Sequence, residues 1–322
     1  MNKSDLNSVL LVGAGQLGLR YLQGLASVSS PLKIFVVDPS SESLDRSREC
    51  LNMIDHEFIH DVHFSTKLSE APNQFNLVIV ATPSHCRSDL VGLISRNCDV
   101  ESWLLEKLLA QNSRQVDLIE NMLMGHSQAW VNTPRRLMAW HKLIKDQILS
   151  SGNAVMQVRL TGGQWGLACN AIHFIDLVRW WTGSQVQNVD CQGLRNWKPS
   201  KRLGFMEVFG TLNVNYENGS RLQLLCDQTN SSPQFEIETV EGTWSISEAE
   251  GKAISPSGHK IPGEVTFQSA LTAPLVNNIL TYGQCDLPSL VDSAAQHRPL
   301  LDALLQHWNE SQNVQDLVVP IT

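Results

Sequence analysis

Hydrophobic and polar positions change their pattern near residue 132. Before it, short apolar runs alternate with stretches of helical periodicity, and the run at 77–81 is apolar throughout. This pattern predicts strands at 9–13, 33–38, 58–62, 77–82, 101–106 and 128–132, and helices at 16–28, 41–52, 84–96 and 112–123. Such alternation predicts an α/β domain with a parallel sheet covered on both faces.

After residue 132 the strand-like segments follow one another, and several are joined by hairpin-type turns such as 217–220. We predict strands at 154–161, 186–192, 207–215, 220–227, 234–240 and 243–247, and helices at 136–150, 170–181, 268–283 and 289–308. The sequence therefore predicts two domains: a Rossmann-type domain at 1–131, and an α+β domain with a mostly antiparallel sheet at 132–322.

Composition narrows the function classes. A chain of 322 residues suits two domains, and the formal net charge of −8 argues against a nucleic-acid partner. Seven scattered cysteines without a C-x-x-C pair indicate reduced thiols in a cytoplasm, and we expect no metal site. The polar N-terminus and the shortness of every apolar run predict neither a signal peptide nor a membrane span.

A glycine-rich turn follows the first predicted strand. Gly13, Gly15 and Gly18 form G-x-G-x-x-G between an apolar run and a helix-like pattern. Gly13 permits the tight turn, Gly15 lets the backbone approach a pyrophosphate, and Gly18 lets the helix pack against the sheet. The helix N-terminus then offers N–H groups to the phosphates. The stretch predicts a dinucleotide site.

An acid ends the second predicted strand. Asp38 lies twenty residues after Gly18, the interval typical of the carboxylate that binds the adenosine ribose. Because a carboxylate repels a 2′-phosphate, Asp38 favours NAD over NADP. The alternative is a surface acid at the end of an ordinary parallel strand.

Two later strands deliver polar residues to the edge where ligands bind in such sheets. The apolar run at 77–81 leads into Thr82, Pro83 and His85, where a plain turn is an alternative interpretation. Glu106 and Lys107 lie at the end of the strand at 101–106, and a salt-bridged surface pair is the alternative there. A lysine beside a nicotinamide could hydrogen-bond a substrate hydroxyl. The predicted cofactor-binding set is Gly13, Gly15, Gln16, Leu17, Gly18, Asp38, Ala81, Thr82, Pro83, His85 and Glu106.

The helix at 170–181 carries His173 and Asp176 on a face it shares with Leu177 and Trp180. Polar groups on an apolar face must be satisfied, so the two form a buried structural pair or face a cleft. The glycine-containing stretch 162–169 precedes this helix. We expect it to be the substrate loop, since its glycines allow close backbone approach.

These features in this order resemble the Gfo/Idh/MocA family of NAD(P)-dependent sugar oxidoreductases. The resemblance covers nearly the whole chain and includes the glycine turn, Ala81-Thr82-Pro83, Glu106-Lys107, the stretch 132–136 and the His173 helix. It implies a Rossmann domain followed by a domain whose open sheet often forms the oligomer interface. It also implies NAD rather than NADP, a sugar, cyclitol or nucleotide-sugar substrate, and a homo-oligomer through the C-terminal sheet.

By this resemblance the catalytic residues are Lys107, His173 and Asp176. His173 would take the hydroxyl proton, while Lys107 would stabilise the negative charge on the reacting oxygen. The weaker candidates for the substrate wall are Arg136, Trp140, Trp165 and Cys169.

Three positions depart from the family pattern. Leu108 replaces a proline whose preceding bond is often cis; because a cis bond costs about 2.5–4 kcal/mol before leucine and about 0.5–1 kcal/mol before proline, we expect the Lys107 loop to follow another path. Cys169 replaces an aspartate, whose role falls to Asp176 or to the substrate, or is lost. Arg87 replaces a histidine and would meet an anionic group or point into solvent.

These departures leave three hypotheses. The first is a dehydrogenase that acts on a CH–OH group. The second is a non-catalytic NAD(H)-binding sensor or scaffold that kept the fold and lost the acid–base residues. The third keeps the enzyme but changes the chemistry to imine or enone reduction, which needs no histidine base.

Overall fold

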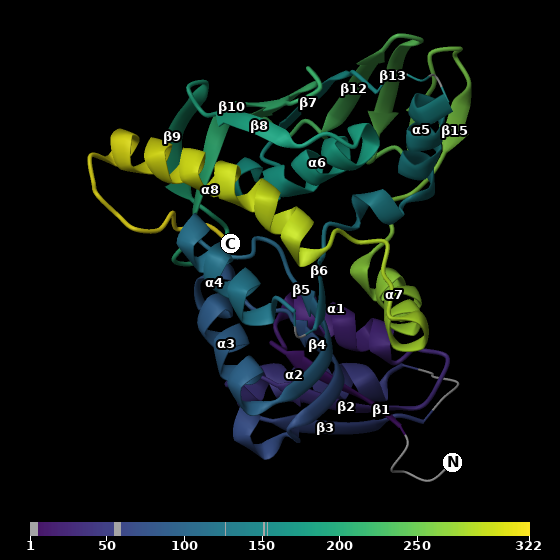
Figure 1. The fold of residues 1–322 in the computed structure, drawn as a ribbon, viewed down its shortest axis with the longest axis vertical. Coiled ribbons are helices and arrows are strands. Elements are labelled where there is room, and N and C mark those ends of the chain that lie inside the picture. Colours follow the sequence, from purple (N-terminus) through teal and green to yellow (C-terminus); the bar gives the residue numbers. More distant parts are fainter. Residues whose placement is uncertain (1–5, 55–58, 126, 151, 153) are drawn as a thin grey trace. The chain divides into compact units, whose positions relative to one another are not determined.

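The computed structural model describes residues 6–54, 59–125, 127–150, 152 and 154–322 (Figure 1). The chain divides into two compact units. Unit 1 comprises Met1–Leu109, Asp117–Asn132 and Thr266–Leu290, and unit 2 comprises Ala110–Val116, Thr133–Val265 and Val291–Thr322. One transition, between Asn132 and Thr133, lies beside the predicted boundary, whereas the segment Thr266–Leu290 joins unit 1 rather than the second domain.

The sheet of unit 1 has six parallel strands in the order β3-β2-β1-β4-β5-β6. They are β1 (Asn7–Val12), β2 (Leu32–Val37), β3 (Asp61–Ser65), β4 (Gln74–Val80), β5 (Asp99–Leu105) and β6 (Gln128–Val131). This is the strand order of a dinucleotide-binding sheet, with its topological switch point between β1 and β4. Central strands are buried on both faces, which explains their unbroken apolar runs. The α/β class predicted for this half is confirmed.

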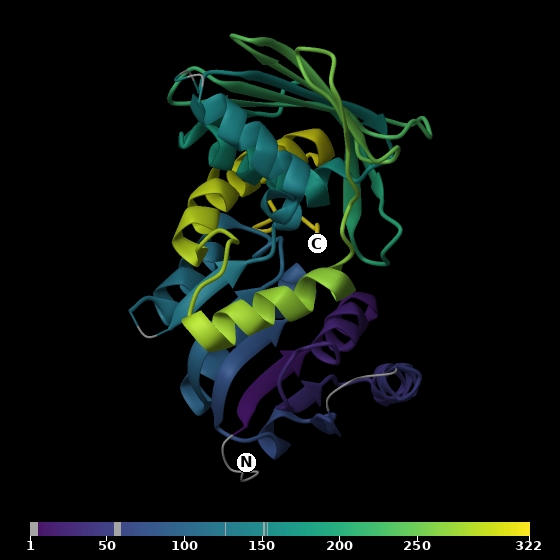
Figure 2. The same cartoon turned by 90° about the vertical axis from the view of Figure 1, so that its right-hand side faces the viewer.

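The helices of unit 1 are α1 (Gln16–Leu25), α2 (Ser41–Asn52), α3 (Ser84–Asn97) and α7 (Gln268–Tyr282), with a short 3₁₀ turn, η2 (Leu68–Glu70). Helix α4 (Ser113–Leu123) begins in unit 2 and continues in unit 1. Helix α7, light green in Figure 2, packs closely on α1, because a Cβ added at Gly24 would lie 2.4 Å from Cβ of Thr272. The 266–290 segment therefore belongs to unit 1 by direct packing.

The sheet of unit 2 has nine strands in the order β15-β14-β13-β12-β7-β11-β10-β8, with β9 paired to β10. They are β7 (Gln157–Gly163), β8 (Val186–Asp190), β9 (Leu194–Pro199), β10 (Met206–Tyr216), β11 (Arg221–Asp227), β12 (Gln234–Thr239), β13 (Gly242–Ser247), β14 (Lys252–Ile254) and β15 (Lys260–Pro262). Only β7 and β11 pair in parallel among these strands, so the prediction of a mostly antiparallel sheet is confirmed.

One face of this sheet is apolar and the other polar. Along β7 and β11 buried residues such as Val158 and Leu222 alternate with exposed ones such as Arg159 and Arg221. Helix α6 (Leu167–Thr182) packs against β10 and β11 and contacts α5 (Ala139–Ser150). The remaining elements of unit 2 are the 3₁₀ turn η3 (Pro134–Leu137) and the long C-terminal helix α8 (Leu290–Gln312).

Three local predictions were wrong. The strand expected at 58–62 is β3 (Asp61–Ser65), because the His60 ring takes the Leu32 N–H just before the ladder begins; residue 58 lies outside the described residues. The helix expected at 136–150 is divided by extended backbone at Met138. Strands β9, β14 and β15 were missed.

Within the described part of the chain, no helix combines the length and the apolar character needed to cross a membrane.

Candidate functional site

The glycine turn has the geometry of a phosphate cradle. Gly13 has a φ of +96°, and a Cβ added there would lie 2.8 Å from the Ala81 carbonyl oxygen. A Cβ at Gly18 would lie 1.8 Å from the Gly13 carbonyl oxygen, whereas a Cβ at Gly15 would meet no atom within 4 Å. Gly15 is the N-cap of α1 and has no side chain to cap the helix. Gly13 and Gly18 are thus required by packing, and Gly15 leaves an open approach to the helix N-terminus.

Asp38 is tied to this turn. Its Oδ2 accepts a hydrogen bond from the Ala14 N–H at 2.7 Å, and its Oδ1 accepts one from the Ser40 N–H at 2.8 Å. A carboxylate has about four acceptor positions, so each oxygen can accept a further bond. The half-buried Asp38 is therefore held rigidly beside the turn with capacity for a diol.

The residues after β4 lie against the same turn. The Thr82 methyl group would lie 3.1 Å from a Cβ added at Gly13. The Thr82 hydroxyl is buried and has no hydrogen-bond partner within the described residues. Pro83 and His85 are exposed, as are Gly15 and Gln16, and Ala81 and Leu17 are half-buried. Unit 1 thus brings the predicted cofactor-binding residues of these two loops together.

Arg87 corrects an expectation. It is only 1% exposed, so it neither points into solvent nor presents its charge to an anion at the surface. Its Nη1 donates to the Leu108 carbonyl, and its Nη2 donates to the Thr82 carbonyl. The guanidinium therefore joins the loop after β4 to the loop after β5.

Glu106 belongs to a buried hydrogen-bond network. Its Oε1 accepts from the Tyr21 hydroxyl at 2.5 Å and from Nδ2 of Asn132 at 2.6 Å. That amide also lies 2.7 Å from Oε1 of Gln268 on α7. Burial raises the pKa of Glu106, while Tyr21, Asn132 and the charge of Lys107 oppose the shift. Glu106 is 4% exposed and lies within this network at the end of β5, and its predicted contact with the cofactor stays a prediction.

Lys107 is half-buried and lies two residues after the end of β5. The Lys107–Leu108 peptide bond is cis. The sequence predicts another path for this loop, because Leu108 replaces a proline whose preceding bond is often cis. Leu108 is fully buried.

In unit 2, Asp176 and Arg136 form a buried ion pair. Arg136 donates from Nη2 to Oδ1 at 2.5 Å and from Nε to Oδ2 at 3.0 Å. Thr133 adds a bond to Oδ2 at 2.8 Å, and Gln296 adds one to Oδ1 at 3.3 Å. Burial raises the pKa of Asp176, and Arg136 opposes that rise. Of the two interpretations left open for Asp176, the structure shows the buried pair, though with Arg136 as its partner.

His173 lies on α6 three residues before Asp176 and is half-buried. The N-terminus of this helix is closed by a carboxylate, since Oε1 of Glu207 accepts the Ala168 N–H at 2.6 Å. Cys169 lies in the first turn of the helix, and its thiol reaches the Gly166 carbonyl at 3.5 Å. The first turn of α6 is therefore not an open anion site.

The stretch 162–169 is not a loop. Residues 162–163 belong to β7 and 167–169 to α6, so only 164–166 connect them. A Cβ at Gly162 would lie 2.8 Å from Cα of Pro233, and one at Gly163 would lie 2.0 Å from the Thr229 carbonyl oxygen. These glycines admit the protein's own 229–233 segment, which corrects the expectation that they serve substrate approach.

The two candidate tryptophans differ in surroundings. Trp140 is 3% exposed and packs on Gly263, where an added Cβ would lie 2.3 Å from its ring. Trp165 is half-buried; its Nε1 donates to the Leu225 carbonyl at 3.0 Å, and its ring meets Phe174 edge-on. Trp140 therefore belongs to the core of unit 2, while Trp165 keeps an exposed part.

Sequence reasoning missed a second charge cluster in unit 2, whose side chains are largely buried. Arg135 donates from Nε and Nη2 to the two carboxylate oxygens of Glu248, each at 3.0 Å. The fully buried His141 lies 3.6 Å from the same carboxylate. Burial alone would raise the pKa of Glu248, but Arg135 and His141 bring it down to about 2.

The buried hydrogen-bonding roles of Asn132 and Arg87 in unit 1 had a signal in the sequence. Asn132 is the last residue of a predicted strand, as Asp38 and Glu106 are. Arg87 shares one helical face with Ser84 and Val91, and a cation on such a face needs a partner.

Comparison with known proteins follows this geometry. No protein-family model and no curated protein sequence matches the chain. Among solved structures, GenD2 from gentamicin A biosynthesis in complex with NAD matches with a TM-score of 0.72 at 15% identity, covering 96% of this chain and 95% of that one.

Two dehydrogenases match equally broadly. Myo-inositol dehydrogenase from Lactobacillus casei in complex with NAD(H) and myo-inositol has a TM-score of 0.69 at 16% identity, covering 98% of each chain. UDP-N-acetylglucosamine 3-dehydrogenase GnnA from Acidithiobacillus ferrooxidans has a TM-score of 0.67 at 15% identity, covering 92% of this chain and 95% of that one. The chain therefore has the fold of these dehydrogenases, which is the fold that the Gfo/Idh/MocA resemblance implies.

Proposed function

We propose that the protein is an NAD-dependent oxidoreductase of the Gfo/Idh/MocA type that acts on a hydroxyl or keto carbon of a sugar, cyclitol or nucleotide-linked sugar. One observation carries the proposal: the Asp38 carboxylate is fixed by the Ala14 N–H beside an open glycine turn. A phosphate-binding turn next to a rigid acid is the arrangement that a dinucleotide with a free ribose diol requires.

The residues present fit the cofactor. The open space at Gly15, the uncapped start of α1 and the unpartnered Thr82 hydroxyl lie at the carboxyl ends of β1 and β4, where this sheet class binds its ligand. NAD or NAD(H) is bound in two of the solved structures that share the fold. When bound, the nicotinamide supplies or accepts the hydride at the substrate carbon.

The protein's own residues supply the acid–base chemistry in this proposal. The Lys107 ammonium donates a hydrogen bond to the reacting oxygen and stabilises its negative charge. The His173 imidazole takes the hydroxyl proton during oxidation and returns it during reduction. Asp176 has both oxygens occupied by Arg136, so we assign it a positioning role on α6 rather than contact with the substrate.

The substrate class follows the named relatives of this fold, which act on myo-inositol and on a UDP-linked sugar. The half-buried Trp165, Cys169 and His173 are the side chains of unit 2 that we assign to the substrate wall. Trp140 is left out because its ring is in the core.

The test is oxidation of a panel of cyclitols, free sugars and UDP-sugars with NAD⁺, followed by the absorbance of the NADH formed. The proposal requires turnover of at least one CH–OH substrate and its loss in Lys107→Met. Tight NADH binding with no turnover of any panel member, and unaltered biological activity of Lys107→Met, would instead indicate a non-catalytic NAD(H)-binding protein.

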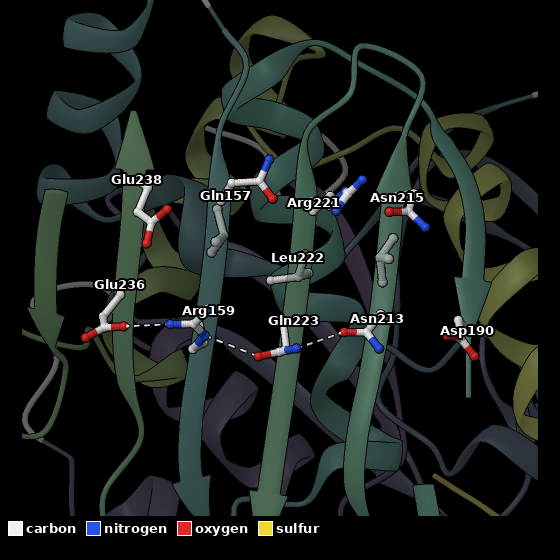
Figure 3. A pocket seen from close by; sticks show the side chains of 12 residues that line it. Gln157, Arg159, Asp190, Asn213, Asn215, Arg221, Leu222, Gln223, Glu236 and Glu238 are labelled. Atoms are coloured by element: carbon white, nitrogen blue, oxygen red, sulfur yellow. Dashed lines mark hydrogen bonds and ion pairs between the residues drawn. The ribbon is translucent and has the colours of Figure 1, made fainter. Parts of the chain in front are cut away.

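We further propose that the polar face of the unit 2 sheet forms a homo-oligomer interface. Figure 3 shows a row of side chains across four strands, in which Glu236 meets Arg159 at 3.4 Å, Arg159 donates to Gln223 at 3.2 Å, and Gln223 donates to Asn213 at 3.2 Å. The row borders a shallow hollow of about 460 Å³. This face carries both cations and carboxylates, so it suits the same face of a second copy of the chain. A two-fold pairing can place Arg159 of each copy within reach of the carboxylates of the other.

A further inference from the structure

Arg87 occupies a position that its charge alone would not favour. It lies at the start of α3 on the buried face of the helix, together with Ser84, Ser88 and Val91, and it is 1% exposed. A buried guanidinium is costly unless its donors are satisfied. Two of its nitrogens donate to backbone carbonyls rather than to a carboxylate.

The two carbonyls belong to different loops. Thr82 follows β4 and lies against the glycine turn, and Leu108 follows Lys107 at the end of β5. β4 and β5 are neighbours in the parallel sheet, so these loops lie at its carboxyl edge. The Arg87 fork therefore connects the loop that we assign to the cofactor with the loop that carries Lys107.

The local electrostatics keep Arg87 in place as a cation. Burial lowers its pKa to about 10, and the charge of Glu106 opposes that shift. Arg87 in turn favours the charged form of Glu106, whose pKa is raised by burial. Arg87 on α3 and Glu106 at the end of β5 are thus two buried groups of opposite charge, each of which favours the charged form of the other.

Other side chains could fill this volume without holding both carbonyls. Arginine presents donors in a rigid planar fork that can hold two acceptors at a fixed separation. A lysine offers one ammonium on a flexible stem, and a methionine offers no donor.

We propose that Arg87 is a positioning residue, which holds the Thr82 loop and the Lys107 loop at a fixed separation. The backbone that meets the cofactor and the reacting oxygen is then already in place before either of them binds. The inference rests on the proposed function, because that function assigns the two loops to the cofactor and to the reacting oxygen. The connection between the loops can be tested without any ligand.

The first experiment is amide hydrogen exchange, read by mass spectrometry, of ligand-free wild type and Arg87→Met. We expect exchange to rise about tenfold or more in peptides spanning 81–86 and 106–110, since charge-assisted hydrogen bonds are lost there, with the rest of the sheet unchanged. The matched control is Arg96→Met on the same helix, because Arg96 is exposed. Exchange in both peptides equal to wild type, or a uniform rise across unit 1, would overturn the proposal.

A second variant keeps the test decisive if Arg87→Met does not fold. Arg87→Lys retains the buried charge but cannot hold both carbonyls in one geometry. Amide exchange in Arg87→Lys should rise in the same two peptides, but by less than in Arg87→Met. Exchange in Arg87→Lys equal to that of wild type would contradict the role of the planar guanidinium.

A measurement of cofactor binding distinguishes a failure of this inference from a failure of the proposed function. If wild type binds NADH, Arg87→Met should weaken that binding by about tenfold or more, Arg87→Lys should weaken it less, and Arg96→Met should bind as wild type does. If wild type binds neither NADH nor NADPH, the proposed function fails, and the exchange experiment alone decides whether Arg87 connects the two loops.

Discussion

The Asp38 carboxylate accepts a hydrogen bond from the Ala14 N–H at 2.7 Å. This bond joins the end of β2 to the turn after β1, so the acid and the glycine turn form one rigid unit. A second bond from the Ser40 N–H fixes the other carboxylate oxygen. The orientation of Asp38 is therefore set before any ligand arrives.

Replacing Asp38 should change the cofactor preference. Asp38→Asn keeps an acceptor for the Ala14 N–H but removes the charge that repels a 2′-phosphate. We expect NADH affinity to fall by about tenfold, since hydrogen bonds to a charged group are lost, and NADPH affinity to rise. Fluorescence titration with both cofactors measures the change. An unaltered NADH to NADPH ratio would show that Asp38 does not contact the ribose.

The glycine turn permits a matched pair of substitutions. Gly18→Ala places a Cβ 1.8 Å from the Gly13 carbonyl oxygen, so it should destabilise the protein by roughly 3 kcal/mol or more. Gly15→Ala meets no atom within 4 Å, so its stability should stay within about 1 kcal/mol of wild type. NADH affinity of Gly15→Ala should nevertheless fall about tenfold, because the methyl group obstructs the pyrophosphate. Urea unfolding and NADH titration measure the two effects. Full NADH affinity in Gly15→Ala would contradict the phosphate assignment.

Lys107→Met tests the reacting-oxygen assignment. Loss of one donor to a developing oxyanion lowers kcat by about 100-fold to 1000-fold. The affinity for NADH should stay close to wild type, since the proposed contact is with the substrate oxygen. Lys67→Met, which removes an exposed lysine of unit 1, serves as the control. Equal loss in both variants would show that the effect is general rather than local to Lys107.

The lowered pKa of Glu248 predicts that the stability of the protein depends on pH. Arg135 and His141 hold its pKa at about 2 against an ordinary value of 4.5, although burial opposes them. The folded protein therefore binds this proton less readily than the unfolded chain does. Its stabilisation is complete above the ordinary pKa and is lost as the pH falls from 4.5 toward 2, a change on the order of 3 kcal/mol.

Urea unfolding across this pH window measures that effect through tryptophan fluorescence. Glu248→Gln should be less stable than wild type at neutral pH and should lose much of the acid dependence. The control is Glu49→Gln, since Glu49 is an exposed carboxylate on α2. An acid dependence of Glu248→Gln equal to that of wild type would contradict the assignment.

The polar sheet face predicts a charge-reversal phenotype. Arg159→Glu would place a second carboxylate beside Glu236 and break the bond to Gln223, so self-association through this face should weaken. Light scattering after size-exclusion chromatography gives the mass. Arg46→Glu, a reversal on the exposed surface of α2, should leave the mass unchanged. A monomeric wild type, or an Arg159→Glu variant of unchanged mass, would rule out this interface.

Local patterns were enough to predict the turn and the acid. Gly13, Gly18 and Asp38 are set by spacing along the chain, and the central strands β1, β2 and β4 show as apolar runs. Strands β14 and β15 have three residues each, which is too short for a period-two pattern to stand out.

Long-range partners explain the rest. Arg87 looks like an ordinary polar helix residue until the fold brings the Leu108 carbonyl, 21 residues away, against it. The apparent substrate glycines Gly162 and Gly163 are explained only by the 229–233 segment that packs on them. Asp176 looked available for chemistry because its partner Arg136, 40 residues earlier, could not be paired with it from the pattern.

The most direct test of the central claim is a titration of the purified protein with NADH and with NADPH, read by energy transfer from its nine tryptophans. The account predicts saturable binding of NADH at concentrations well below those needed for NADPH. Binding of neither cofactor would mean that the glycine turn and Asp38 serve the fold alone, and the proposed oxidoreductase function would have to be abandoned.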